Sequence, residues 1–225
     1  MTRLALLALA LVLAGCGGDA RGAGTATLWV TRDRGQHVLY EGTVPAGLTA
    51  MQALDRKLDI ETRYGGRFVE AIGGIHGNAA KQRDWFWYVN GIEGDRSAGE
   101  YRLRDGDVEW WDYRSWKRQM RVPVVVGAFP EPFLHGYDGI DRGAIVVGGD
   151  DETAEQLAEA VGGSILHGPG AVDVRNVIAI RRNLPANAAY AERDAHAVRL
   201  ILGVRAADRL AHDPSVLRFR YEVRR

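Results

Sequence analysis

Apolar residues in the N-terminal half of the chain recur with two different spacings, which predict several strands around one helix. In five short runs, apolar, β-branched and aromatic residues are concentrated, as is typical of strands. Between the second and third runs, Leu48, Met51, Leu54 and Leu58 recur at helical spacing, which predicts an amphipathic helix that begins near Thr49. We therefore expect a mixed sheet packed on one helix. The predicted strands are residues 25–31, 37–44, 68–72, 85–89 and 108–113.

One of these strands is almost entirely aromatic. It runs from Trp85 to Val89 and ends at Asn90-Gly91, a dipeptide that favours a tight turn. Alternation places Trp85, Trp87 and Val89 on one face and the two intervening rings on the other. Either both faces of this strand are covered by the rest of the protein, or one face is exposed for a ligand.

Strand and helix patterns alternate in the C-terminal half, which predicts a small α/β domain. We place the first domain at residues 25–117 and this second domain at 118–225, so the whole chain is expected to be of the α+β class. No known family is identified in the second domain. Its predicted strands are residues 122–126, 144–147, 177–180 and 216–223, and its predicted helices are residues 152–161 and 187–202. In the last strand, alternation places Leu217, Phe219, Tyr221 and Val223 on the buried face.

Residues 1–16 have the features of an export signal. Arg3 precedes an apolar run, residues 4–13, that is shorter than the about 20 residues a membrane-spanning helix needs. The run ends in Leu-Ala-Gly-Cys16, which resembles the lipobox of bacterial lipoproteins, where the chain is cut before the cysteine and the cysteine is acylated. Residues 17–24 are small and rich in glycine, and they predict a flexible tether. The alternative is an ordinary signal peptide in which Cys16 occurs by chance.

Composition excludes several classes of function. Lys and Arg number 29 and so do Asp and Glu, whereas nucleic-acid binding needs a basic surplus. Cys16 is the only cysteine. Once it is acylated, the protein has no thiol for a disulfide, a cysteine metal site or a cysteine nucleophile.

Three segments of the first domain match the motifs of a known family. Residues 41–54 contain a strand, a G-x-T turn and a helix, residues 85–91 are Trp-Phe-Trp-Tyr-Val-Asn-Gly, and residues 101–110 end in Gly-Asp-Val-Glu-Trp. In this order they resemble the transcobalamin-like C-terminal domain, the DUF4430 family. The resemblance implies a β-grasp fold of the soluble-ligand-binding type. In vitamin B12 carriers the related domain covers one face of the corrinoid beside a helical barrel, for which this sequence has no room, so the resemblance implies binding without naming the ligand.

The aromatic residues of the first domain are the strongest candidate for a ligand site. Indole and phenol rings combine broad apolar faces with a polar edge, which suits flat ligands such as macrocycles and sugars. The alternative is that these rings fill the core and the seam with the second domain, and that Asn90 only forms a turn. The candidate ligand-binding residues are Trp85, Trp87, Tyr88, Asn90, Trp110, Trp111 and Tyr113.

No pattern in the sequence predicts catalysis, a metal site or a cofactor. No serine lies in a G-x-S-x-G motif, and the histidines lack ligand spacing. His135 with Glu131, or His167 with Asp173, would be at most partial metal sites. Residues 148–151, Gly-Gly-Asp-Asp, lie between a predicted strand and a predicted helix, and they favour a helix cap over a phosphate site because two aspartates repel phosphate.

The sequence therefore predicts a lipid-anchored, extracytoplasmic binding protein that is not an enzyme. Its partners are expected to be the membrane, through Cys16, and either a small-molecule ligand or a transporter or surface protein, with a role beside an importer of a vitamin or metal. The alternative is a structural or adhesion module that binds protein or wall glycan and no small molecule.

Overall fold

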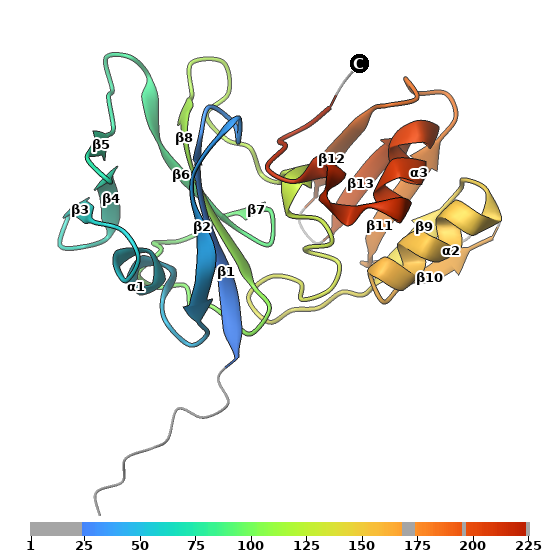
Figure 1. Cartoon of the computed structure of the whole chain (residues 1–225), viewed down its shortest axis with the longest axis horizontal. Coiled ribbons are helices and arrows are strands. Elements are labelled where there is room, and N and C mark those ends of the chain that lie inside the picture. The colour runs from blue at the N-terminus through green and yellow to red at the C-terminus, as the bar shows by residue number, and fades with distance from the viewer. Residues whose placement is uncertain (1–23, 168–173, 195–196, 224–225) are drawn as a thin grey trace, which may run out of the picture.

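The computed structural model describes residues 24–167, 174–194 and 197–223, which form two units side by side, each built on its own sheet (Figure 1). Helices and strands occur in both units, which confirms the α+β class. The predicted export signal with Cys16, and the tether up to residue 23, lie outside the described residues. Within the described ranges, no helix combines the length and apolarity that crossing a membrane requires.

The first sheet has five strands in the order β2-β1-β8-β6-β7. The two central neighbours β1 and β8 run parallel, and the remaining neighbours are antiparallel. This arrangement confirms the predicted mixed sheet and four of its predicted strands. The strands are β1 (Thr25–Arg32), β2 (His37–Pro45), β6 (Arg83–Val89), β7 (Ile92–Glu93) and β8 (Val108–Ser115).

One face of this sheet is covered by the helix α1 (Ala50–Asp55) and by a small sheet of three strands. The helix begins at the predicted cap: Gln52 N donates to Thr49 Oγ1 at 3.2 Å, and Thr49 N donates to Gln52 Oε1 at 2.9 Å. It is shorter than predicted and ends before Leu58, which still packs against the core. The small sheet comprises β3 (Ile60–Arg63), β4 (Phe68–Ile72) and β5 (Ile75–His76).

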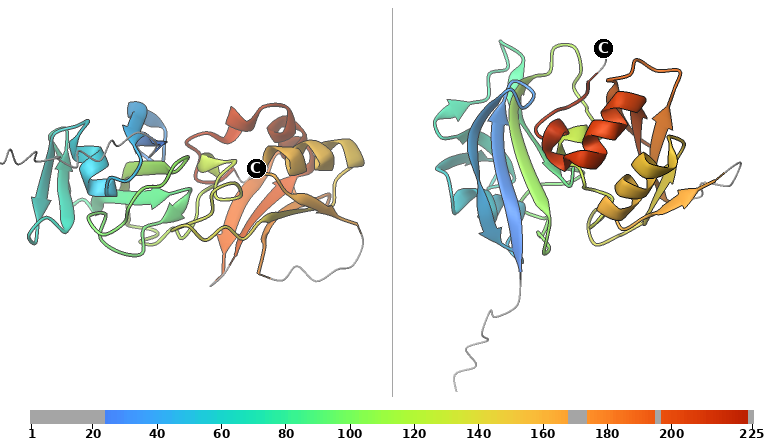
Figure 2. Two further views of the ribbon diagram at one scale, coloured as in Figure 1. Left: turned by 90° about the horizontal axis from the view of Figure 1, so that it is seen from below. Right: turned by 45° about the vertical axis from the view of Figure 1, so that its right-hand side comes forward.

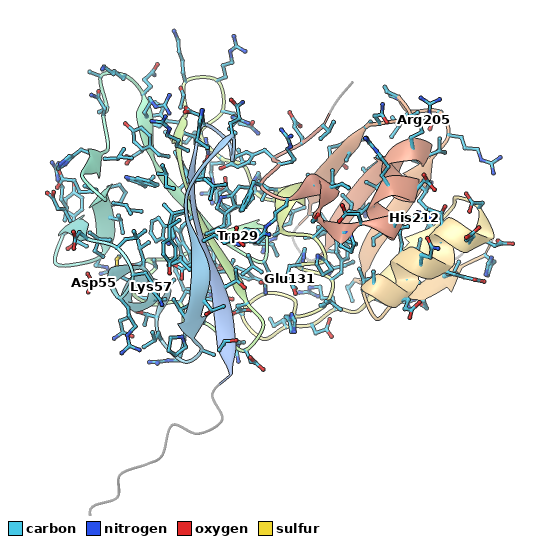
Figure 3. All side chains as sticks on the ribbon, in the orientation of Figure 1. Trp29, Asp55, Lys57, Glu131, Arg205 and His212 are labelled. Atoms are coloured by element: carbon cyan, nitrogen blue, oxygen red, sulfur yellow. The ribbon has the colours of Figure 1, made fainter. Side chains whose placement is uncertain are left out.

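The opposite face of the first sheet is covered by residues from the C-terminal half. Trp29 of β1, Tyr88 of β6 and Trp110 of β8 pack there against the segment 122–128 and against Tyr221. Trp29 extends from the first sheet toward the second unit (Figure 3). Both faces of the aromatic strand are therefore covered, and they alternate as predicted from its sequence.

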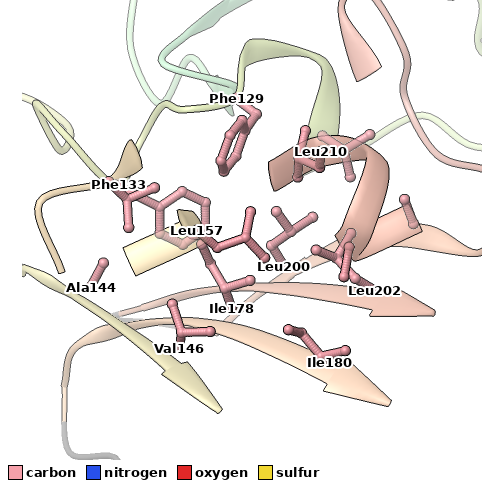
Figure 4. Close-up of a cluster of buried hydrophobic side chains, with 14 of the residues drawn as sticks. Phe129, Phe133, Ala144, Val146, Leu157, Ile178, Ile180, Leu200, Leu202 and Leu210 are labelled. Carbon is pink, nitrogen blue, oxygen red and sulfur yellow. The ribbon is translucent and has the colours of Figure 1, made fainter. Parts of the chain in front are cut away.

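The second sheet has the order β10-β9-β11-β13-β12, in which only β12 is antiparallel to its neighbour. Helices α2 (Asp151–Ala160) and α3 (Val204–His212) cover one face of it (Figure 2). Leu157 and Leu210 from the helices meet Ile178 and Leu200 from the strands in the core (Figure 4). The strands are β9 (Ala144–Val147), β10 (Ser164–Leu166), β11 (Asn176–Arg181), β12 (Ala189–Arg193) and β13 (Val198–Gly203).

The predictions for β9, α2 and β11 are confirmed, and so is the cap of α2, where Thr153 N donates to Asp150 Oδ1 at 2.9 Å. The helix predicted at 187–202 is wrong. That segment forms the antiparallel pair β12 and β13, because Ala197 N donates to Asp194 Oδ1 at 2.8 Å and the chain reverses there. The helix α3 begins only at Val204.

Two further strand predictions in the C-terminal half are wrong. Residues 122–126 contribute only an isolated bridge between Val124 and Ile92, and a 3-10 turn, η1 (Val126–Ala128), follows. In the segment 216–223, a second 3-10 turn, η2 (Pro214–Leu217), occupies the start, and Phe219 adopts a left-handed backbone conformation that no strand allows. Leu217 and Tyr221 are nevertheless both buried, as the alternation predicted.

Residues 218–223, which we call the C-terminal strap, connect the two units. Val126 N donates to Tyr221 O at 3.3 Å, and Phe219 N donates to Gly127 O at 3.3 Å. A Cβ at Gly127 would lie 2.5 Å from Arg220 N, so only glycine allows this close approach. Val223 then pairs with Ala189 of β12 through two backbone hydrogen bonds of 2.6 Å. The strap thus covers the first sheet and extends the edge of the second.

A buried hydrogen-bond network fixes the strap to the first sheet. Trp110 Nε1 donates to Thr31 Oγ1 at 2.8 Å, and Thr31 Oγ1 donates to Asp112 Oδ1 at 2.7 Å. The Tyr221 hydroxyl donates to Asp112 Oδ2 at 2.9 Å. Two backbone N–H groups, of Arg34 and Gly35, complete the shell of Asp112 at 3.1 Å each. Four donors therefore converge on one buried carboxyl. Burial raises the pKa of Asp112, and these four hydrogen bonds oppose the rise.

Candidate functional site

The register of β6 and β8 brings the predicted aromatic residues together in cross-strand pairs. Trp85 lies opposite Tyr113, Trp87 opposite Trp111, and Tyr88 opposite Trp110. The first two pairs face α1 and the small sheet, whereas the third pair faces the C-terminal half. The structure therefore divides six of the seven candidate residues between the two faces of the first sheet, and the seventh, Asn90, follows β6.

Three of the candidate tryptophans line one pocket. Its volume is about 350 Å³, and we call it the tryptophan pocket. Trp85 and Trp111 are buried, whereas Trp87 is half-buried. Sequence reasoning missed the other walls, because they come from separate elements that only the fold brings together. These walls are Met51 of α1, Phe68 and Val69 of β4 with the preceding Arg67, and residues 96–98 after β7.

The indole rings of the tryptophan pocket are held in fixed positions. Trp85 Nε1 donates to Ile75 O at 2.7 Å, and Trp111 Nε1 donates to Glu109 Oε1 at 2.5 Å. Trp87 and Trp111 are stacked, with centroids 6.0 Å apart and planes inclined by 23°. The indole N–H of Trp87 has no hydrogen-bond partner among the residues that the structure describes. The pyrrole edge of Trp87 packs on Gly94, where a Cβ would lie 2.6 Å from Nε1.

Charges at the rim of the tryptophan pocket are neutralised within the protein. Arg67 Nη2 donates to Glu100 Oε1 at 2.7 Å. Arg96 pairs with Asp95 and with Asp138, at 2.8 Å each. The floor is aromatic and the rim consists of paired charges, so the pocket favours a neutral ligand with a flat apolar face over an ion.

The remaining candidate residues do not line this pocket. Tyr88 and Trp110 are fully buried on the opposite face, and burial raises the pKa of Tyr88 to about 12. Asn90 is also fully buried and has a positive φ of 53°, as its predicted turn requires. Its amide Nδ2 donates to Asp107 Oδ1 and to Gly136 O, both at 2.8 Å, so Asn90 joins the turn to the segment between the units. Tyr113 packs on Trp85 at 5.3 Å between centroids.

A buried carboxyl lies behind the tryptophan pocket. Glu109 is fully buried, and its Oε2 has no hydrogen-bond partner among the residues described. Burial raises the pKa of Glu109 well above its ordinary value of 4.5, and the bond from Trp111 opposes this only in part. The folded protein therefore keeps this carboxyl neutral at pH values where the unfolded chain has ionised it.

We expect the variant Glu109→Gln to remove a pH dependence of stability. Because the folded state holds the extra proton, the wild type loses stability as pH rises above 4.5, by up to about 1.4 kcal/mol per pH unit until the folded-state pKa is reached. The neutral amide has no such loss, so the stability of Glu109→Gln relative to wild type should increase as pH rises above 4.5. Urea unfolding across this range measures the difference. The exposed Glu155→Gln is the control and should show a constant difference; a constant difference for Glu109→Gln as well would contradict the prediction.

The histidines do not assemble a metal centre in the described parts of the chain, where no group of three or more His, Cys, Asp and Glu side chains is close enough to hold an ion. His135 Nδ1 lies 2.5 Å from Glu131 Oε1, and His135 N donates to Glu131 Oε2 at 3.0 Å. Both carboxylate oxygens of Glu131 therefore contact the same residue, His135, four positions further along the chain. Asp173, the suggested partner of His167, lies outside the described residues.

A larger hollow, of about 650 Å³, lies between α3 and the C-terminal strap. Its described lining includes the exposed Arg209 and Arg220 and no aromatic ring. Long exposed side chains form much of its wall, so it lacks the fixed geometry of the tryptophan pocket. We therefore take the tryptophan pocket as the candidate site.

Comparisons with known proteins cover the first unit. Residues 47–115 match the model of a family described as "Domain of unknown function (DUF4430)", which confirms the resemblance inferred from the sequence. A search of curated proteins finds no match. Similar solved structures include a candidate metal binding protein from Ruminococcus gnavus ATCC 29149, at 18% identity over 41% of this chain and 97% of that chain, with a TM-score of 0.32. Haptocorrin in complex with Cbi is similar at 18% identity over 41% of this chain and 26% of that chain, also with a TM-score of 0.32.

Proposed function

We propose, taking residues 47–115 as a DUF4430 domain, that this protein is a lipid-anchored extracytoplasmic binder whose tryptophan pocket takes a small planar ligand. The first unit is assigned to the β-grasp type, because its parallel pair β1 and β8 is central and α1 follows the hairpin of β1 and β2 across one face. The proposed function is binding, without a catalytic step. The anchor would hold the pocket beside a membrane transporter for a vitamin or metal.

The single observation that carries this proposal is the convergence of three indoles on one pocket with a neutral rim. A volume of about 350 Å³ lies at the lower end of the range of small-molecule sites. It suits a ligand of one or two fused rings, and it is too small to enclose a corrinoid, which would contact it by an edge. Trp87 is the least buried of the three indoles, so we expect its ring to contribute most to the binding energy.

Tryptophan fluorescence tests the pocket directly. We expect caffeine, a neutral planar two-ring probe, to quench the fluorescence saturably, and Trp87→Leu to weaken its binding about two- to tenfold, because the variant removes a stacking surface worth about 0.5–1.5 kcal/mol. Cyanocobalamin, with its absorbance corrected, tests whether a macrocycle binds as well.

The matched control is Trp116→Leu, which removes one indole that lies after β8 and outside the pocket. It should keep the affinity of the wild type for caffeine. Equal quenching of wild type and Trp87→Leu, or no saturable quenching by either probe, would remove the tryptophan pocket as a ligand site.

The lipid anchor is tested independently of the pocket. Mass spectrometry of the mature protein should show a chain that begins at Cys16 and carries acyl chains, and Cys16→Ala should release the protein from the membrane fraction. An unmodified product that retains residues 1–15 would overturn the proposed location without affecting the pocket.

One surface feature favours the second candidate function, docking of a protein or wall glycan. Tyr64 is 79% exposed and packs edge to face on Phe68, which is 41% exposed, next to the small sheet. Exposed aromatic pairs are typical of binding surfaces. If this pair is the binding surface, Tyr64→Ser should abolish sedimentation with insoluble peptidoglycan, whereas Trp87→Leu should not.

A further inference from the structure

A second cavity lies between the two units and belongs to neither sheet alone. Its volume is about 180 Å³. Asp95 and Arg96 enter it from the loop after β7, the edge strand of the first sheet. Tyr137 and Asp138 come from the segment that connects the units, and Arg193 comes from the end of β12. We call this cavity the inter-unit cleft.

Both carboxylates of the inter-unit cleft already have partners. Asp95 Oδ1 accepts from Arg96 Nε at 2.8 Å and from the Tyr137 hydroxyl at 2.9 Å. Asp138 Oδ2 lies 2.8 Å from Arg96 Nη2, and its Oδ1 lies 3.7 Å from Arg104 Nη2. One guanidinium, that of Arg96, thus joins two carboxylates.

Two further guanidinium groups in the inter-unit cleft have no carboxylate partner among the residues that the structure describes. Arg193 lies over a ring, its Cζ 5.5 Å from the centroid of Tyr137, and it also lines a neighbouring hollow with Glu192 and Glu222. Arg142 is partly buried and lines the same cavity. Three guanidiniums against two paired carboxylates leave the cleft with a surplus positive charge. Partly buried guanidiniums lose hydration, and an anionic partner restores the hydrogen bonds that water gave.

We propose that the inter-unit cleft binds a small oxyanion, a phosphate or a carboxylate, between Arg142 and Arg193. The planar fork of each guanidinium matches two oxygens of such a group, and partial burial reduces the screening of the attraction by salt. At about 30 Å³ for each water molecule, the cavity has room for about six waters. A volume of this size matches inorganic phosphate or a short dicarboxylate. Because the walls come from both units, the bound anion would bridge them.

Calorimetric titration with inorganic phosphate and, separately, with succinate tests the proposal and distinguishes the two sources of the oxyanion. We expect one of them to bind saturably and to raise the melting temperature above that in sodium chloride of equal ionic strength. The double variant Arg142→Gln and Arg193→Gln should weaken this binding about tenfold or more. The control double variant Arg56→Gln and Arg205→Gln removes two exposed charges elsewhere and should bind as the wild type does.

Wild-type titration remains decisive even where the double variant folds poorly. Saturable binding of neither anion by the wild type would overturn the proposal. So would equal weakening by both double variants, because that result assigns binding to net charge alone. Titration of the tryptophan pocket with caffeine is a separate measurement, so the failure of one site leaves the other proposal intact.

Discussion

The variant Tyr221→Ala is expected to lower the free energy of unfolding by about 3–5 kcal/mol, the range for removal of a large aromatic side chain from a core. Tyr221 is only 6% exposed, and it packs edge to face on Trp110 and Tyr88 at centroid distances of 5.4 and 5.7 Å. Alanine would leave a cavity between the strap and the first sheet, and it would remove the hydroxyl that donates to Asp112. Urea unfolding followed by tryptophan fluorescence and by circular dichroism measures the loss.

The variant Tyr221→Phe separates packing from hydrogen bonding. It keeps the ring and should cost about 1–2 kcal/mol, because only the donor to Asp112 is lost. If Tyr221→Ala costs no more than Tyr221→Phe, the strap does not pack on the first sheet as described. Because the strap contacts both sheets, we also expect the two optical signals of Tyr221→Ala to change together as urea increases.

The second large effect is expected for Asp112→Ala, with a loss of about 3 kcal/mol in the free energy of unfolding. The substitution leaves the buried Tyr221 hydroxyl and the partly buried backbone N–H groups of Arg34 and Gly35 without their acceptor. An unsatisfied buried donor costs about 1–3 kcal/mol, and the two partly buried donors cost less because water reaches them. Thr31 retains a weaker acceptor, Trp111 O at 3.4 Å, which limits the total.

Asp112→Asn keeps one acceptor oxygen and should cost less than half as much as Asp112→Ala, measured by the same urea unfolding. The exposed Asp55→Ala is the control for loss of an aspartate and should stay within about 0.5 kcal/mol of wild type. A double-mutant cycle between Asp112→Ala and Tyr221→Phe should show coupling of about 1 kcal/mol, since one bond joins the two side chains. Additive effects would contradict the role given to this network.

The first unit could be predicted well from the sequence because its local signals agree with its tertiary structure. Alternation from Trp85 to Val89 fixed the two faces of β6, and Thr49 with Gln52 marked the start of α1. The tryptophan pocket was predicted only in part. Its three indoles were among the candidate residues, but Arg67, Phe68 and Arg96 come from separate loops and strands, and no sequence pattern relates them to β6 or β8.

The second unit was harder to predict because local preference and tertiary pairing conflict there. The alanine-rich segment 187–202 favours a helix locally, yet the hydrogen bonds around Asp194 reverse it into β12 and β13, where Leu200 and Leu202 are buried. Similarly, the alternation at 216–223 predicts that Leu217 and Tyr221 are buried, but it does not predict the left-handed backbone conformation of Phe219 that prevents a strand. Tertiary contacts override helix propensity most easily in short segments such as these.

The strap imposes an order on the synthesis of this protein. Asp112 and Tyr221 are separated by 109 positions in the chain, so the first sheet leaves the ribosome long before the residues that cover its second face. Until then Trp29, Trp110 and Tyr88 are covered on that side only by the segment 122–128, and the nascent first unit still exposes part of this aromatic face. The cover of this aromatic face is therefore completed only when the last residues of the second unit have been synthesised.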